Sequence, residues 1–121
     1  MKKRFLMAGI VGVLLALTLV FSGCDLLEPD QPGTIILRNT STFTYDSSIS
    51  GYLLYYSDGS THSYGTCYRN STLTFNDVPI GTNFRLRVTD GYYDTYYTLS
   101  FSLSSGETRT YVFNGYTLSL Q

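Results

Sequence analysis

Residues 97–104 alternate strictly between apolar and polar side chains, and this alternation constrains the fold more than any other feature of the chain. Two aromatic residues and two leucines occupy one set of positions, and one threonine and three serines occupy the other. Successive side chains of a β-strand point to opposite faces, so the pattern predicts a strand with one dry face and one wet face. Residues 84–88 repeat the pattern, with Arg85 and Arg87 at the positions expected to face solvent.

The chain from Thr34 onward favours strands throughout. Tyr, Thr, Phe, Val and Ile dominate its composition, and these residues fit a pleated sheet. No stretch shows the sustained 3.6-residue periodicity of an amphipathic helix. Asp58-Gly59 and Asn114-Gly115 can supply the positive φ that tight hairpins require. The expected strands are 34–39, 49–57, 60–68, 71–76, 83–90, 95–104, 107–113 and 116–120.

Short strands with turns about every ten residues indicate an all-β fold. We expect a single antiparallel β-sandwich of about 7–8 strands, and a small barrel is the alternative. The sandwich is favoured because the gaps at 40–48 and 77–82 are long enough for the chain to cross from one sheet to the other.

One segment also resembles a known family. In residues 75–88, Val78, Pro79 and Gly81 form a Val-Pro-x-Gly turn that leads into Phe84 and an alternating strand. This is similar to a segment of transthyretin-like sandwiches of the carboxypeptidase-regulatory type, and the resemblance implies a sandwich of that kind. Immunoglobulin-like topology is the open alternative.

The N-terminus reads as an export signal. A basic start (Lys2, Lys3, Arg4) precedes an apolar run at 5–21, which ends in Ser22-Gly23-Cys24. The last three residues resemble the lipobox of bacterial lipoprotein signal peptides. The resemblance implies that Cys24 carries a diacylglycerol and becomes the new N-terminus. A plain signal peptide or a retained signal anchor is the alternative.

This interpretation divides the chain into a signal peptide at 1–23, a tether at 24–33 and a sandwich domain at 34–121. It predicts a protein of the bacterial cell envelope that is held on the membrane through the lipid on Cys24, with the leaflet left open. Acyl chains contribute about 0.8 kcal/mol per buried CH₂, so two or more of them anchor a protein stably.

Charge excludes one class of partner. Removing 1–23 deletes both lysines and Arg4, and the remaining chain has five arginines, nine acidic residues and a net charge of −4. Nucleic acids and anionic headgroups require clustered cations. We therefore expect no nucleic-acid partner.

Catalytic and metal sites are not expected either. With Cys24 lipidated, Cys67 has no partner for a disulfide, and we expect its thiol to be buried. His62 is the sole histidine. If residues 60–68 form one regular strand, the side chains of His62 and Cys67 point to opposite faces, which argues against a Cys/His pair. The acidic residues fall at expected turns, where Asp is favoured because its side chain bonds to its own backbone. A calcium-binding loop at 90–94 is the alternative, although its spacing does not match a dedicated calcium loop. The acidic residues at turns are Asp46, Asp58, Asp77, Asp90 and Asp94.

Tyrosine is the one compositional excess, with twelve residues in the chain. Adjacent pairs such as Tyr55/Tyr56 and Tyr96/Tyr97 must split between the two faces of a strand, so one of each pair should face outward. Tyrosine is enriched in protein interfaces. The candidate binding residues are Tyr92, Tyr93, Tyr96, Tyr55 and Tyr56.

We therefore expect a non-catalytic binding domain that recognises a protein or a glycan through exposed tyrosines, without a cofactor or metal. A structural or assembly component of the envelope, which pairs through open sheet edges, is the alternative. An enzyme is a remote alternative.

The lipid anchor is tested by metabolic labelling. Cells that express the full chain with a palmitate analogue should incorporate the label into the wild type and not into Cys24→Ala. Label that persists in Cys24→Ala, or is absent from the wild type, would exclude acylation at this residue.

Overall fold

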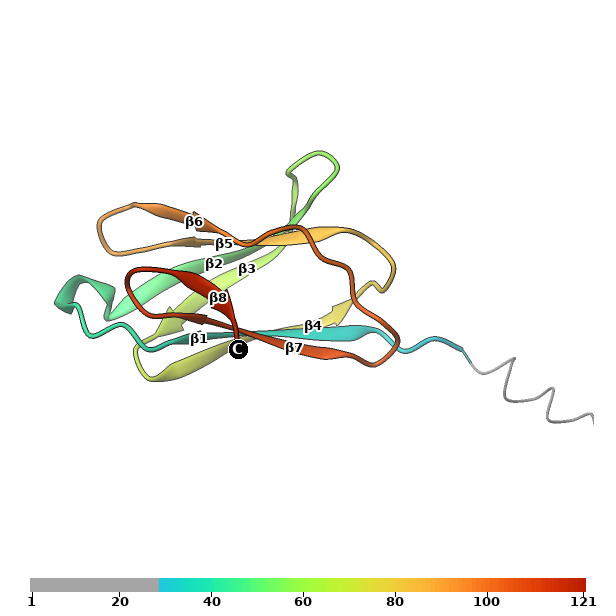
Figure 1. The fold of residues 1–121 in the computed structure, drawn as a ribbon, viewed down its shortest axis with the longest axis horizontal. Helices are drawn as coiled ribbons and strands as arrows, with labels where there is room; N and C mark the ends of the chain where they lie inside the picture. Colours follow the sequence, from blue (N-terminus) through green and yellow to red (C-terminus); the bar gives the residue numbers. More distant parts are fainter. Residues whose placement is uncertain (1–28) are drawn as a thin grey trace, which may run out of the picture.

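The strands form two four-stranded sheets that pack face to face as a sandwich (Figure 1). The computed structural model describes residues 29–121, so the expected signal peptide and Cys24 lie outside the described residues. None of the helices in this part of the chain has the length and apolarity needed to cross a membrane. The strands are β1 (Gly33–Asn39), β2 (Ser48–Tyr55), β3 (Thr61–Tyr68), β4 (Ser71–Val78), β5 (Phe84–Thr89), β6 (Thr95–Tyr97), β7 (Thr108–Phe113) and β8 (Leu118–Leu120).

The strand order is β4-β1-β7-β8 in one sheet and β3-β2-β5-β6 in the other. The chain crosses between the sheets after β1 and after β4, as the long gaps at 40–48 and 77–82 predict. The expectation of a purely antiparallel sandwich is wrong at one pair, because β1 and β7 are parallel. Parallel neighbours need a long crossover connection, and here the whole second sheet lies between β1 and β7 in the sequence.

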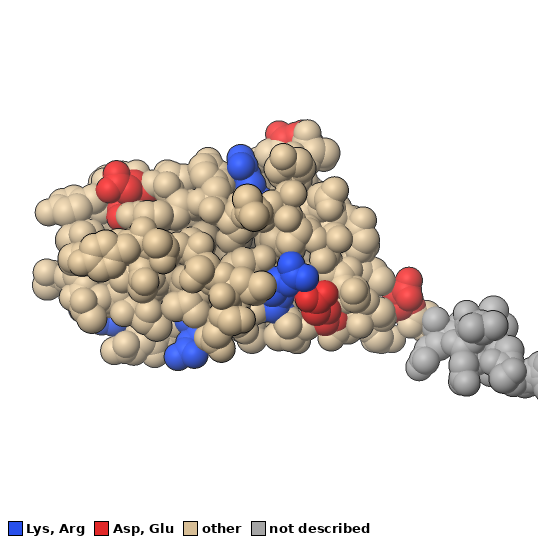
Figure 2. All heavy atoms as spheres, in the orientation of Figure 1, with Lys and Arg blue, Asp and Glu red and all other residues tan. Residues whose placement is uncertain are grey.

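The core lies between the two sheets and is made by alternate residues of each strand. In β5 the pattern is regular, since Phe84, Leu86 and Val88 are buried while the two arginines between them are half-buried. Burying a Leu, Val or Phe side chain contributes about 1.5–3 kcal/mol, so this row stabilises the sandwich strongly. Outside the core the surface carries few charges, and those on the face shown in Figure 2 are scattered.

The expected strand at 95–104 is wrong beyond its first three residues. Arg87 pairs with Tyr97 and Phe84 pairs with Phe101, so three steps along β5 are matched by four steps along the partner segment. One extra residue is therefore inserted, which is a β-bulge. At the bulge Leu86 N donates a 3.0 Å hydrogen bond to Thr98 Oγ1.

The bulge reverses which residues face inward. Tyr97, before the bulge, and Leu99, within it, point away from the core, and Leu99 is 89% exposed. After the bulge, Phe101 and Leu103 are buried. The sequence pattern placed all four on one dry face. A single inserted residue moves every following side chain to the other face, so the alternation is real but does not belong to one strand.

Cys67 is fully buried, which confirms the expectation, and within residues 29–121 it is a free thiol. Its Sγ lies 3.4 Å from the Leu37 carbonyl oxygen in the core. Burial raises the pKa of the thiol, and the thiolate is the reactive form. The folded protein should therefore protect this cysteine.

The burial of Cys67 is tested in the Cys24→Ala variant, in which Cys67 is the one remaining cysteine. An aromatic disulfide reagent should label it at least a hundredfold more slowly in buffer than in urea. Equal rates in the two solutions, in a sample that still unfolds cooperatively, would contradict burial.

Candidate functional site

Three loops meet at the end of the sandwich opposite to the point where β1 begins (Figure 1). They are the crossing segment 40–47, the β5–β6 turn 90–94 and the β7–β8 turn 114–117. Each carries aromatic side chains. Because loops held by a rigid scaffold often carry binding residues, this end is a candidate site, and we call it the aromatic tip. Its members are Phe43, Tyr45, Tyr92, Tyr93 and Tyr116.

Four of these rings form a continuous series across the three loops. Phe43 stacks on Tyr45 with ring centroids 5.1 Å apart and contacts Tyr116 edge-to-face at 5.0 Å. Tyr45 in turn packs against Tyr92, with centroids 4.1 Å apart. Such pairs contribute about 0.5–1.5 kcal/mol each beyond the area they bury. The tip is therefore a connected aromatic cluster and not a set of separate side chains.

A buried carboxylate ties two of the loops together. Asp46 is fully buried; its Oδ1 accepts a 3.1 Å hydrogen bond from Gly91 N, and its Oδ2 accepts one of 2.5 Å from the Ser41 hydroxyl. Gly91 packs so closely that a Cβ would collide with the Tyr45 carbonyl. The crossing segment and the β5–β6 turn are thus held in fixed contact.

Arg69, at the β3–β4 turn, holds the crossing segment from the other side. Its Nε donates a 3.0 Å hydrogen bond to the Ser41 carbonyl, and its Nη2 donates to the Phe43 carbonyl. The guanidinium thereby satisfies backbone acceptors that the segment cannot pair within a sheet.

Asp90 shapes the β5–β6 turn. Its Oδ1 accepts hydrogen bonds of 2.9 Å from the backbone N–H groups of Tyr92 and Asp94, and the Tyr96 hydroxyl donates to its Oδ2 at 3.2 Å. This is the turn-forming role that the sequence predicts for Asp90. In residues 29–121 no group of three His, Cys, Asp or Glu side chains gathers as metal ligands would. Burial, with the charge of Asp90, raises the pKa of Tyr96 to about 12, so its hydroxyl keeps its proton and can donate to Asp90 well into alkaline solution.

The tip still presents much of its aromatic surface to solvent. Tyr92, Tyr93 and Tyr116 are 68%, 87% and 72% exposed, and Tyr93 has a φ of 68°. A left-handed backbone is uncommon for a residue with a bulky side chain. The turn that Asp90 closes therefore holds the ring of Tyr93, the most exposed of the three, in solvent.

The five tyrosines predicted to bind do not lie together. Tyr92 and Tyr93 belong to the tip. Tyr96 packs inward against Phe113, with ring centroids 4.9 Å apart, and Tyr55 packs on Phe84 at 5.0 Å.

Tyr56 is exposed on the outer face of the β3-β2-β5-β6 sheet, near Arg85. The splitting of the pairs is as predicted, since Tyr56 and Tyr97 are the outward members. Sequence reasoning missed Phe43, Tyr45 and Tyr116, which join the tip only because the sandwich topology brings their loops to one end.

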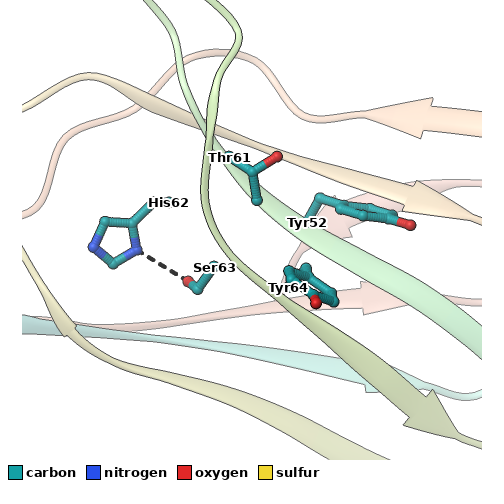
Figure 3. A pocket seen from close by; sticks show the side chains of 5 residues that line it. All are labelled: Tyr52, Thr61, His62, Ser63 and Tyr64. Atoms are coloured by element: carbon teal, nitrogen blue, oxygen red, sulfur yellow. Dashed lines mark hydrogen bonds between the residues drawn. The ribbon is translucent and has the colours of Figure 1, made fainter.

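The expectation that His62 and Cys67 point to opposite faces of one regular strand is wrong, because a one-residue slip at His62 turns its ring toward the inner face, on which Cys67 is also buried. His62 lies where the β2–β3 ladder slips by one residue, and its ring contacts Tyr55 and Phe84 at centroid distances of 5.6 and 5.5 Å. Its Nδ1 is 3.0 Å from Ser63 Oγ (Figure 3). The shallow hollow beside them is lined by Tyr52, Thr61, His62, Ser63 and Tyr64 and has no carboxylate in its lining. The third group that orients a catalytic histidine is therefore missing from this lining.

No protein-family model, no curated protein and no solved structure matches this chain. The function must therefore be argued from the geometry of the described residues.

Replacing Asp46 by Asn tests whether the carboxylate holds the tip together. Asn has one side-chain acceptor oxygen, so it can accept the hydrogen bond from Gly91 N or from the Ser41 hydroxyl but not both. We therefore expect the free energy of unfolding to fall by about 1–3 kcal/mol. Urea unfolding measures this. Asp94→Asn, at an exposed position of the β5–β6 turn, should change it by less than about 0.5 kcal/mol, and an equal loss in both variants would contradict the role given to Asp46.

Proposed function

We propose that this protein is a lipid-anchored lipoprotein of the bacterial cell envelope whose sandwich binds a protein partner through the aromatic tip. The observation that carries the proposal is the connected aromatic cluster on three loops, with Tyr92, Tyr93 and Tyr116 mostly exposed. The anchor rests on the sequence motif at Cys24.

Rigidity supports recognition at this end. Binding normally costs conformational entropy, because side chains and loops become ordered at the interface. The buried Asp46 and the close contact of Gly91 with Tyr45 order these loops before any partner arrives. Tyrosine adds a large, amphipathic contact area with few rotatable bonds, as in the loops of antibodies.

A protein partner fits the tip better than a glycan does. Phe43, Tyr45 and Tyr92 pack ring against ring, so the ring faces by which they meet are closed to a sugar. The exposed ring edges and hydroxyls suit the mixed apolar and polar surface of a protein.

Assembly through sheet edges has less support. Edge strands that avoid pairing with other chains are short or bulged. Here β6 and β8 have three residues each, and both β3 and β4 pair through a register shift.

The tip is tested by affinity capture from envelope extract with the full chain in detergent. Changing Tyr92, Tyr93 and Tyr116 to Ser should reduce the recovery of specific partners by at least about tenfold, since a few aromatic residues dominate most interfaces. The control is Tyr64→Ser/Tyr68→Ser, which removes two tyrosines of similar exposure from β3, outside the aromatic tip. Partners that are recovered equally with the wild type and the triple variant would defeat the proposal.

A further inference from the structure

The outer face of the β3-β2-β5-β6 sheet carries a second group of tyrosines, interleaved with arginines. All six project outward from strands of this sheet or from its β2–β3 turn, away from the core. We call this surface the Tyr–Arg face. Its members are Tyr52, Tyr56, Tyr64, Arg85, Arg87 and Tyr97.

Strand register aligns one row of this face across all four strands. Tyr52 of β2 pairs with Tyr64 of β3 and with Arg87 of β5, and Arg87 pairs with Tyr97 of β6. The rings of Tyr52 and Tyr64 stack with centroids 6.0 Å apart. Arg87 Cζ lies 4.2 Å from the centroid of the Tyr52 ring, which is a cation–π contact.

Arg85 is held in the same way by two other rings. Its Cζ lies 4.1 Å from the Tyr97 centroid and 5.9 Å from that of Tyr56. Leu54, which also points outward, is only 4% exposed, so neighbouring side chains lie over it and cover it. Both guanidinium groups are therefore held in defined positions.

The two arginines have no acidic partner on this sheet. Strands β2, β3, β5 and β6 contain no Asp or Glu, and the one ion pair among the described residues joins Arg109 to Glu107. Arg87 Nε is buried and has no hydrogen-bond partner within residues 29–121. Asp58 in the β2–β3 turn and Asp90 in the β5–β6 turn are acidic neighbours of this sheet, but neither forms an ion pair with Arg85 or Arg87.

We propose that the Tyr–Arg face binds an acidic polysaccharide, with sugar carboxylates on Arg85 and Arg87. Arginine presents a planar set of donors that matches a carboxylate, and a stacked guanidinium loses less freedom when it binds. The two arginines are two residues apart on β5, roughly 7 Å along the strand, so one extended polysaccharide chain can reach both. The tyrosine hydroxyls around them can bond to sugar hydroxyls.

The backbone argues against an acidic peptide as the occupant. Peptides that bind to sheets commonly add a strand to an open edge, but β2 and β5, which carry Tyr52 and both arginines, are paired on both sides. The two central strands therefore offer side-chain donors and aromatic rings without a free backbone ladder, and the open edges of this sheet belong to β3 and β6. This inference does not rest on the role of the aromatic tip, although the two surfaces adjoin where Tyr52 lines one hollow with Tyr45 and Tyr93 of the tip.

Binding of polygalacturonate to the full chain in detergent tests the proposal, with dextran as the neutral comparison and polyglutamate as the acidic polypeptide. We expect polygalacturonate to bind and Arg85→Gln/Arg87→Gln to weaken its Kd at least tenfold. Arg38→Gln, which removes one charge from an exposed position on the other sheet, should stay within twofold. Thermal unfolding confirms that each variant is folded.

A second variant keeps the total charge. Arg85→Lys/Arg87→Lys should also weaken binding severalfold, because lysine lacks the planar donors that stack on tyrosine. The Tyr92, Tyr93 and Tyr116 triple variant should bind polygalacturonate like the wild type, which separates this site from the tip.

Three results would overturn the inference. One is binding no tighter than that of dextran. Another is an equal loss in Arg38→Gln, which would indicate general electrostatic attraction. The third is binding of polyglutamate with the same affinity and the same dependence on Arg85 and Arg87, which would make an acidic polypeptide the ligand.

Discussion

A buried polar network at the end of β1 holds the two sheets and two of the three tip loops in one arrangement. Asn39 is fully buried, and its Nδ2 donates to the carbonyl oxygens of Asp46 at 2.9 Å and Cys67 at 3.4 Å. Its Oδ1 accepts a 3.1 Å hydrogen bond from Ser41 N. Asp46 then carries the connection to Gly91. One side chain of β1 thus reaches both the crossing segment and β3.

This network has a consequence for the surface as well as for stability. Buried polar groups are costly unless they are fully paired, and in a low-dielectric interior paired networks are strong and specific. The crossing segment that begins at this network bears Phe43 and Tyr45, while Gly91 sits beside Tyr92. The position of the exposed rings therefore depends on hydrogen bonds made beneath them. A partner that binds the tip meets a preformed surface.

Much of the fold follows from the sequence, because alternation and turn dipeptides are local signals. Gly59 and Gly115 have φ of 73° and 95°, as the Asp-Gly and Asn-Gly turns predict, and the alternation in β5 gives the right inward face. The bulge after Tyr97 could not be predicted in this way. A threonine hydroxyl takes the place of a backbone acceptor there, and nothing in the alternation marks the inserted residue.

The candidate sites were harder to predict, because both depend on contacts between distant parts of the chain. The alternation places Arg85 and Arg87 on a solvent face, and only the register with β2 and β6 reveals that they lie against tyrosines. Asp46 reads as a turn residue, and its burial emerges only once the β5–β6 turn packs on it. Exposure of one member in each adjacent tyrosine pair was predictable, since it follows from strand geometry alone.

The direction of β1 also relates the two surfaces to the end at which the chain enters the sandwich. A strand of seven residues spans roughly 23 Å, and β1 runs from the end nearest the N-terminal segment toward the aromatic tip (Figure 1). The described chain therefore enters the sandwich at the end opposite the aromatic tip. The Tyr–Arg face lies along the side of the sandwich, parallel to the strands. Because Tyr52 of this face lines one hollow with Tyr45 and Tyr93 of the tip, a polysaccharide bound along the strands would reach the edge of the site proposed for the protein partner.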